Sequence, residues 1–327
     1  MLILAGDVGG TSTRLAYFEQ RGAELAIRAE GHFPSAQFPS LYRIVQLFRT
    51  QHGLIPQRAC FGIAGPIIEG GVKTPNLPWH IDGTLLAREV GLPEVQLIND
   101  LTANTYGIAM LRDRDLAVLN EGQPEPTGTI AVVSPGTGLG EALAYWDGRG
   151  HRPLPSEAGH ADFAPRNDLE ADLLHYLRSQ FGRVSYERVV SGPGLVNIYH
   201  FLRDRRYATE DPSIAAELAQ VDPAPVITQA ALAGSSALCV RALEVFVSIC
   251  GAECGNVALR FLATGGVYLG GGIPPRILTK LQEPAFLDAF CNKGRLTPLL
   301  ASIPVKVILN DRTALFGAGR AAIIQEF

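Results

Sequence analysis

Several residue types and patterns that mark common classes of protein are scarce in this chain of 327 residues. Lysine occurs only four times, and 28 basic residues are outnumbered by 32 acidic ones, which gives a net charge of −4. Nucleic acids and anionic lipids attract a strongly basic surface, so we expect neither as a partner. No apolar run approaches the roughly 20 residues of a membrane-spanning helix, and we expect no membrane association.

Cysteine is also sparse, and its spacing indicates reduced thiols. Five cysteines stand at positions 60, 239, 250, 254 and 291, an odd number without a CxxC pair. A chain of this length needs no disulfide staples, and Cys250 and Cys254 are interpreted as core residues of one helix. The N-terminus has no basic segment and reaches Asp7 at once, unlike a secretory signal. We therefore predict a cytoplasmic protein.

The common nucleotide-binding motifs are missing as well. No Gly-Lys dipeptide occurs, which excludes a Walker A loop. The stretch from Gly136 to Gly140 has Glu141 where a dinucleotide fingerprint needs glycine, and strands are expected on both sides of it. The HExxH, GxSxG and protein-kinase motifs are also absent.

The chain has instead 35 glycines, many of them clustered beside strand-like runs. Asp7-Val-Gly-Gly-Thr11 places a carboxylate, two glycines and a hydroxyl at the end of a predicted strand. The amides of Gly9 and Gly10 and the Thr11 hydroxyl can donate to phosphate, while Asp7 can hold Mg²⁺ directly or through water. Pro135 to Gly138 is a similar turn. Either turn alone fits an ordinary hairpin, but their matching places in two units favour phosphate binding.

The order of expected elements occurs twice, as strand, glycine turn, two strands, helix, strand and helix. The two series begin at residue 2 and near residue 129. We infer two α/β units of mixed sheet with a cleft between them, and the last helix, 312–325, can return to the first unit. We also expect one long helix over 228–262 and a surface excursion at 208–226, which has three prolines and little periodicity.

A second group of candidates is polar. Asn99 and Asp100 follow an apolar strand directly, where open α/β sheets bind ligands, although either could instead cap the next helix. Glu157 and His160 lie three residues apart, and Glu187 begins a short helical stretch. Carboxylates, amide and imidazole suit sugar hydroxyls, whereas the spacing makes a poor zinc site. For His160 alone, a buried structural histidine is an equal alternative.

Taken together, these motifs resemble one family. Seven segments stand in order between about residues 2 and 325. They are Asp7–Thr11, Leu97–Asp100, Gly136–Gly140, Glu157–His160, Glu187–Leu195, Gly265–Ile273 and Phe316–Gly319. The set is similar to the bacterial ATP-dependent glucokinases, in the zinc-free branch of the actin-like sugar kinase superfamily.

This resemblance implies an α/β, two-domain actin-like ATPase (ribonuclease H-like) fold with a cleft for sugar and ATP. The implied small domain covers 1–110 plus about 310–327, and the large domain covers 111–309. A cytoplasmic homodimer that acts in glycolysis is also implied.

The implied reaction transfers phosphate from MgATP to the 6-hydroxyl of glucose, with Asp100 as the base. The resemblance assigns five residues to the sugar: Asn99, Asp100, Glu157, His160 and Glu187. It assigns a further set to the nucleotide and its metal: Gly6, Asp7, Gly9, Gly10, Thr11, Gly136, Thr137, Gly138, Gly265, Gly266 and Gly271. Asp7 is the residue on the Mg²⁺ side.

Two departures from the family pattern stand out. Ser12 replaces the usual Asn or Lys, and Ser134-Pro135 precedes the second turn where a smaller residue is usual. Three alternatives stay open: a kinase for mannose, fructose or an N-acetylhexosamine, a sugar-responsive regulator without turnover, and a filament-forming ATPase. The intact base candidate and both turns favour an enzyme, and the sugar set would have no use in a filament.

Overall fold

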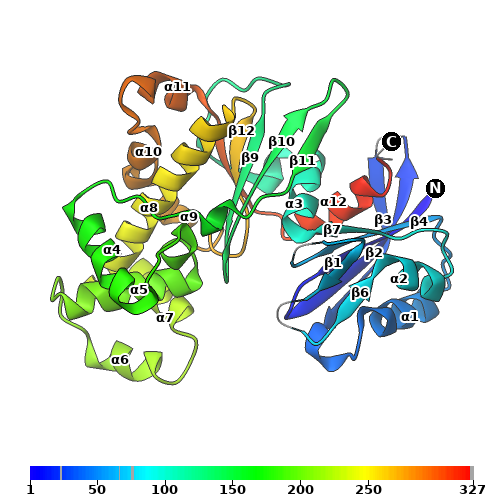
Figure 1. Ribbon diagram of the computed structural model, residues 1–327, viewed down its shortest axis with the longest axis horizontal. Coiled ribbons are helices and arrows are strands. Elements are labelled where there is room, and N and C mark those ends of the chain that lie inside the picture. The colour runs from blue at the N-terminus through cyan, green and yellow to red at the C-terminus, as the bar shows by residue number, and fades with distance from the viewer. Residues whose placement is uncertain (23, 66, 75–76, 325–327) are drawn as a thin grey trace. The chain divides into compact units, whose positions relative to one another are not determined.

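The computed structural model describes residues 1–22, 24–65, 67–74 and 77–324. The chain divides into two compact units. Unit 1 comprises Met1–Asp115, Arg152–Pro155 and Asn310–Phe327, and unit 2 comprises Leu116–His151 and Ser156–Leu309. Each unit is an α/β structure built on a mixed sheet (Figure 1), so the predicted fold class is confirmed.

Unit 1 is organised around a five-stranded sheet in the order β3-β2-β1-β4-β7. Its strands are β1 (Leu2–Val8), β2 (Ser12–Arg21), β3 (Glu24–Pro34), β4 (Arg58–Ile63) and β7 (Gln96–Asn99). The first three strands are antiparallel, whereas β1, β4 and β7 run parallel. The central strand β1 is buried on both faces, which explains its nearly unbroken apolar sequence.

Helices cover both faces of this sheet (Figure 1). Leu4 and Val8 of β1 pack with α1 (Leu41–His52) and α2 (Gly83–Val90). Ile3 and Ala5 point the other way and pack with α3 (Asp100–Gly107) and α12 (Thr313–Ala321). The helices α3 and α12 approach each other closely at Gly317, where a Cβ would lie 1.7 Å from the carbonyl oxygen of Ala103. This close approach requires glycine at position 317.

The remaining elements of unit 1 are short. They are the antiparallel pair β5 (Gly71–Lys73) and β6 (His80–Asp82), and the 3-10 helices η1 (Ser35–Gln37), η2 (Ile108–Met110) and η3 (Asp113–Asp115).

Unit 2 repeats the sheet topology of unit 1 and adds a strand. Its order is β11-β10-β9-β12-β13-β8. The strands are β8 (Leu116–Asn120), β9 (Ile130–Pro135), β10 (Leu139–Trp146), β12 (Gly266–Leu269) and β13 (Val305–Ile308), together with the edge strand β11 (His151–Leu154), of which Arg152–Leu154 are counted with unit 1. The strand β9 takes the place of β1, since it is antiparallel to β10 and parallel to β12. The expected repetition of topology is confirmed, and β8 joins as an extra antiparallel edge strand.

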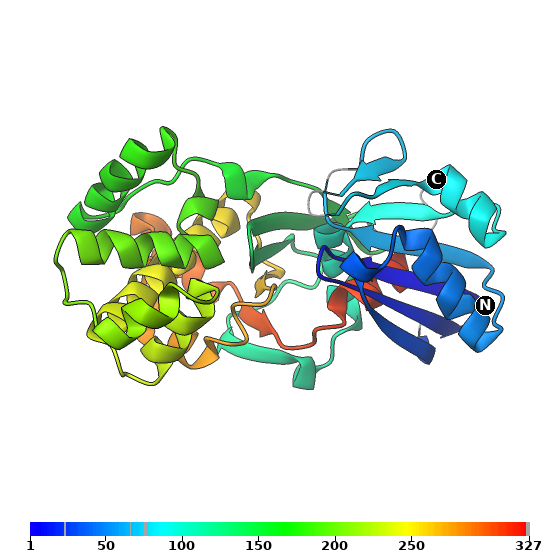
Figure 2. The ribbon, with the colours of Figure 1, turned by 90° about the horizontal axis from the view of Figure 1, so that it is seen from below.

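The helices of unit 2 pack around the 25-residue α8 (Figure 2). They are α4 (Asp168–Phe181), α5 (Gly192–Asp204), α6 (Pro212–Leu218), α7 (Pro223–Leu232), α8 (Ala237–Phe261), α9 (Leu278–Leu281), α10 (Pro284–Cys291) and α11 (Thr297–Ser302). Three 3-10 helices complete the unit: η4 (Ala158–His160), η5 (Tyr186–Arg188) and η6 (Gly294–Leu296). Cys250 and Cys254 of α8 are free and buried in this core, which confirms their interpretation.

One expectation for this region is wrong. The predicted helix 228–262 is two helices, because Gly234 takes a left-handed conformation and Ser236 caps α8 by accepting from the Cys239 amide. The stretch 208–226 lies at the surface as expected, since none of its residues before Val226 is buried, and it contains α6 and the start of α7, each capped by an aspartate that precedes proline (Asp211 and Asp222). Among the described helices, none alone is long and apolar enough to cross a membrane, and only the bent pair α7–α8 passes that test together.

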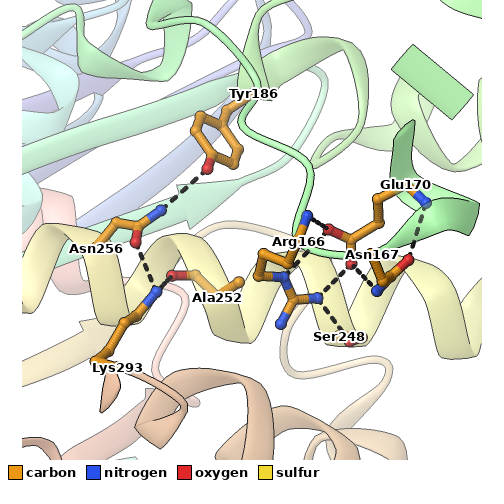
Figure 3. Close-up of polar contacts among 8 residues, drawn as sticks. All are labelled: Arg166, Asn167, Glu170, Tyr186, Ser248, Ala252, Asn256 and Lys293. Carbon is orange, nitrogen blue, oxygen red and sulfur yellow. Dashed lines mark hydrogen bonds and ion pairs between the residues drawn. The ribbon is translucent and has the colours of Figure 1, made fainter. Parts of the chain in front are cut away.

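Polar side chains fix loops of unit 2 onto α8 (Figure 3). Arg166 forms an ion pair with Glu170 and donates to Ser248 Oγ at 2.9 Å. Asn256 Nδ2 donates to the Tyr186 hydroxyl at 3.0 Å, and Lys293 Nζ donates to Asn256 Oδ1 at 2.6 Å. These bonds anchor the segments around 166, 186 and 293 to one rigid helix.

One buried acid stands outside this network. Glu141 of β10 is 1% exposed, and within the described residues neither of its carboxylate oxygens has a hydrogen-bond partner. Burial, and next the charge of buried Glu253, raise the pKa of Glu141 to about 8, while Arg260 opposes the shift. Glu141 is therefore protonated in the folded protein at neutral pH.

We expect stability to fall with rising pH because of Glu141. Its folded pKa lies above its unfolded value, so its contribution is complete near pH 4.5 and is lost toward pH 8. Relative to Glu141→Gln, the wild-type free energy of unfolding should fall by roughly 1.4 kcal/mol per pH unit in this window. Urea unfolding at several pH values measures it. The exposed control Glu121→Gln should show the same pH dependence of stability as the wild type. If Glu141→Gln also kept the wild-type pH dependence, the assignment would be contradicted.

Candidate functional site

The glycine turn of unit 1 joins β1 to β2, whose last paired residues are Val8 and Thr13. Gly9 N donates to Ser12 O at 2.9 Å, which closes the turn and occupies the Gly9 amide. In the described parts of the chain, the amides of Gly10 and Thr11 donate to no acceptor. These two amides, rather than that of Gly9, are available to a phosphate group.

Ser35 supports this turn and was not found by sequence analysis. Its amide donates to Thr11 O at 3.1 Å, and its hydroxyl donates to Gly9 O at 2.8 Å. The Thr13 hydroxyl lies 2.9 Å from the Ser35 hydroxyl oxygen. The turn is thus held from the side by η1, and no local pattern around residue 35 indicates it.

Asp7, beside the turn, faces Arg14 across the β1–β2 ladder. Burial, and then repulsion from Asp100, raise the pKa of Asp7 to about 6, and the Arg14 charge opposes this rise. Arg14 donates to Asp311 Oδ2 at 2.6 Å and to Asp311 O at 3.0 Å. Sequence analysis did not identify Arg14 as part of the site, although Asp7 and Arg14 are equally far from the centre of the hairpin.

Asn99 and Asp100 lie at the junction of β7 and α3. Asn99 Oδ1 accepts from the amides of Leu101 at 2.9 Å and Thr102 at 3.3 Å, so Asn99 is the helix cap. Its Nδ2 donates one hydrogen to Gly65 O at 3.1 Å. Asp100 is the first residue of α3, at the positive end of the helix dipole. Asp7 pairs with Gly62 of β4, and a Cβ on Gly62 would lie 3.7 Å from Asp100 Cα, so Asp7 and Asp100 lie near one another.

The glycine turn of unit 2 closes in the same way. Gly136 N donates to Gly138 O at 2.8 Å, and Gly136 O accepts from Gly192 N at 2.8 Å. Thr137 at its tip is exposed, like Thr11 in unit 1. Gly271 packs against this turn, since it has a φ of +79° and a Cβ there would lie 2.5 Å from Pro135 O. The absence of that Cβ also leaves room for the unusual Ser134.

Three other glycines assigned to the nucleotide have structural reasons to be glycine. A Cβ on buried Gly6 would lie 2.3 Å from Phe61 Cδ1, and one on Gly265 would lie 2.5 Å from Gly128 O. Gly266 has a φ of +121°. Their role toward a nucleotide stays a prediction.

The three sugar candidates of unit 2 lie together. His160 Nε2 is 4.0 Å from Glu157 Oε2, and His160 Nδ1 is 3.9 Å from Glu187 Oε1. The His160 side chain is 56% exposed, so the alternative of a buried structural histidine is wrong. Glu187 Oε2 also accepts from Leu139 N at 3.0 Å. The structure therefore groups Asp7, Asn99 and Asp100 in unit 1, and Glu157, His160 and Glu187 in unit 2.

The fold and its two turns define the class of protein. A solved glucokinase from an Antarctic psychrotroph superposes with a TM-score of 0.88 at 33% identity, covering 98% of each chain. A ROK hexokinase from Thermus thermophilus, at 19% identity and a TM-score of 0.65, covers 99% of this chain and 98% of its own. The chain has the actin-like ATPase fold of the sugar kinases.

The sequence comparisons identify the family. A curated glucokinase of Nostoc sp. (strain PCC 7120) is 45% identical over 337 residues, or 98% of both chains. That of Synechocystis sp. (strain PCC 6803) is 40% identical over 344 residues, covering 98% of this chain and 97% of its own. The Glucokinase family model matches residues 4–325. The chain belongs to the glucokinase family, which confirms the resemblance inferred from the seven motifs.

Removing the Arg14 charge should raise the pKa of Asp7 above about 6, because Arg14 favours the ionised carboxylate. We expect a rise of roughly half a unit or more in Arg14→Gln. NMR titration of ¹³Cγ-labelled aspartate, with Asp7→Asn for assignment, measures it. The control Arg21→Gln lies on the same strand but pairs with Glu19, so it should leave this titration unchanged. An unshifted Asp7 in Arg14→Gln would contradict the electrostatic role.

Proposed function

We propose that this protein phosphorylates glucose on its 6-hydroxyl, with MgATP as donor and glucose 6-phosphate and ADP as products. The observation that carries the proposal is the grouping of Glu157, His160 and Glu187 beside a glycine turn, in a chain of the glucokinase family. A solved ROK family glucokinase from Streptomyces griseus is in complex with glucose and AMPPNP, which supports ATP as the donor.

Asp100 is the base in this proposal. Phosphoryl transfer has a loose transition state, so the enzyme mainly positions the reactants and stabilises charge. A sugar hydroxyl is a weak nucleophile, and Asp100 orients it and takes its proton late in the step. Asp100 lies in the first turn of α3, at the positive end of the helix dipole.

The other sugar contacts come from groups with spare hydrogen-bonding capacity. Asn99 uses one hydrogen of its amide for Gly65, so the second is available to a hydroxyl. Glu157 and His160 are largely exposed, with side chains 74% and 56% accessible, and can reach a ligand from solvent. Glu187 contributes Oε1, the oxygen that faces His160.

The phosphates of ATP bind to the two glycine turns in this account. The open amides of Gly10 and Thr11 serve one turn, and Thr137 and Gly138 serve the other, with Gly265, Gly266 and Gly271 on the adenosine side. Gly6 and Gly9 shape the first turn, and Gly136 shapes the second.

Mg²⁺ fits the neighbourhood of Asp7. Asp7 and Asp100 are neighbouring carboxylates whose repulsion a divalent cation relieves. Across the described residues, no group of three or more His, Cys, Asp or Glu side chains could hold a metal. Mg²⁺ suits such a site because it usually keeps waters and substrate phosphates beside one or two carboxylates. Bound there, directly or through water, it would neutralise phosphate charge.

Further parts of the proposal concern the protein as a whole. We assign the small domain to about 1–110 plus 310–327 and the large domain to 111–309, close to units 1 and 2. Five free cysteines support a reducing, cytoplasmic location. The family resemblance supports a homodimer acting in glycolysis, and light scattering during gel filtration tests that oligomeric state.

The direct test is a glucose 6-phosphate assay with purified protein, MgATP and glucose, beside mannose, fructose, N-acetylglucosamine and a blank without sugar. Selective turnover of glucose supports the proposal. Turnover of another sugar alone would keep the mechanism and change the substrate. No turnover, with a melting temperature that glucose still raises, would instead indicate a sugar-responsive regulator.

Replacing the base should abolish turnover without unfolding the protein. We expect Asp100→Ala to lower kcat by at least ~10³, because the hydroxyl loses both its orientation and its proton acceptor. Asp113→Ala removes an exposed carboxylate of the same unit and should leave kcat unchanged. Steady-state kinetics on both variants, with circular dichroism to check folding, measures the effect. A loss below about tenfold in Asp100→Ala would exclude Asp100 as the base.

A further inference from the structure

Glu187 joins two parts of unit 2 that the proposed function uses for different substrates. Its Oε1 faces the sugar candidate His160 at 3.9 Å. Its Oε2 accepts from the amide of Leu139 at 3.0 Å, directly after the Gly136–Gly138 turn. One oxygen of the Glu187 carboxylate therefore faces the sugar candidate His160, and the other accepts from the residue that follows the Gly136–Gly138 turn.

The Gly136–Gly138 turn contacts the segment that carries Glu187 at a second point. Gly192 N, five residues beyond Glu187, donates to Gly136 O at 2.8 Å. Gly159 also lies against Leu139, the residue whose amide Glu187 binds, because a Cβ on Gly159 would lie 2.0 Å from Leu139 O. The turn is thus bracketed by the two segments that carry Glu157, His160 and Glu187.

Hydrogen bonds hold the backbone of the segment that carries Glu187 in place. Tyr186 is 1% exposed, and its hydroxyl accepts from Asn256 Nδ2 at 3.0 Å, which Lys293 holds in turn (Figure 3). The Ser191 hydroxyl donates to the Glu187 carbonyl oxygen at 2.6 Å. Because the backbone is held in place, the Glu187 carboxylate can move only by rotation within its own side chain.

We propose that Glu187 is a positioning residue that couples sugar binding to nucleotide binding. A sugar hydroxyl bound at Oε1 fixes the carboxylate, so that Oε2 holds the Leu139 amide and the Gly136–Gly138 turn in one conformation. The turn then binds phosphate without first being ordered. The carboxylate also lies against the turn itself, since a Cβ on Gly138 would lie 2.6 Å from Oε2. The inference rests on the proposed function and adds a link between its two substrates.

Such coupling is reciprocal, because a sugar that tightens nucleotide binding must itself bind more tightly to the nucleotide complex by the same factor. The measured quantity is therefore a ratio: the Kd of AMPPNP with Mg²⁺ without glucose, divided by the Kd with saturating glucose. A weaker sugar or nucleotide contact alone changes the individual Kd values, whereas loss of the link changes the ratio. A merely structural role for Glu187 would leave the ratio intact.

Two matched variants separate these cases by calorimetry. Glu187→Asp and Glu157→Asp each withdraw a carboxylate by one methylene, but only Glu187 contacts the Leu139 amide. We expect a wild-type ratio of roughly fivefold or more. Both variants should bind glucose more weakly, Glu157→Asp should keep the wild-type ratio, and Glu187→Asp should reduce it to about one.

Each outcome bears on a defined claim. A wild-type ratio of one, or an unchanged ratio in Glu187→Asp, overturns the coupling while glucose phosphorylation persists. Absence of glucose 6-phosphate with the wild type overturns the proposed function instead. If Glu187→Asp fails to fold, Gly138→Ala serves as the second variant, since its Cβ displaces Oε2 from the Leu139 amide. In Gly138→Ala, too, the ratio of the two Kd values should fall to about one.

Discussion

A single backbone hydrogen bond closes each glycine turn, and the rest of the candidate site depends on these two bonds. Gly9 N donates to Ser12 O at 2.9 Å, and Gly136 N donates to Gly138 O at 2.8 Å. Each turn follows the central strand of its sheet, and the next strand runs back antiparallel to that strand. The repeated sheets thus place a small loop, with an exposed threonine at its tip, at the same point of each unit. Side chains with catalytic or binding chemistry are then added around it.

The two units surround this common turn with different chemistry. Unit 1 gathers the carboxylates of Asp7 and Asp100 with one balancing guanidinium, that of Arg14. Repelling carboxylates next to a phosphate loop suit a divalent cation and a base. In unit 2 the turn is bound by Glu187, one of the proposed sugar residues, and the segment that carries Glu187 is anchored on α8. In the proposed function, charge stabilisation and sugar specificity therefore come from side chains on separate hydrophobic cores.

Sequence patterns predicted what depends on local rules. Strand periodicity, the glycine turns and the cap at Asn99 were all visible in a few consecutive residues. The helix predicted over 228–262 failed because its apolar spacing continues through Gly234 and Ser236, which end one helix and cap the next. The bond between Glu187 and Leu139 joins residues 48 apart and has no local signature. The bond from Ser35 to Gly9 and the burial of Glu141 likewise depend on tertiary packing.

The central claim is that Asp100 acts as the base on the 6-hydroxyl of glucose. A crystal structure with glucose and AMPPNP bound tests it most directly, because it locates the hydroxyl and the carboxylate at once. The account predicts an Asp100 carboxylate oxygen about 2.6–3.2 Å from the 6-hydroxyl oxygen, with Glu157, His160 and Glu187 on the other hydroxyls. A 6-hydroxyl bound to a different acid, with Asp100 out of reach, would contradict it.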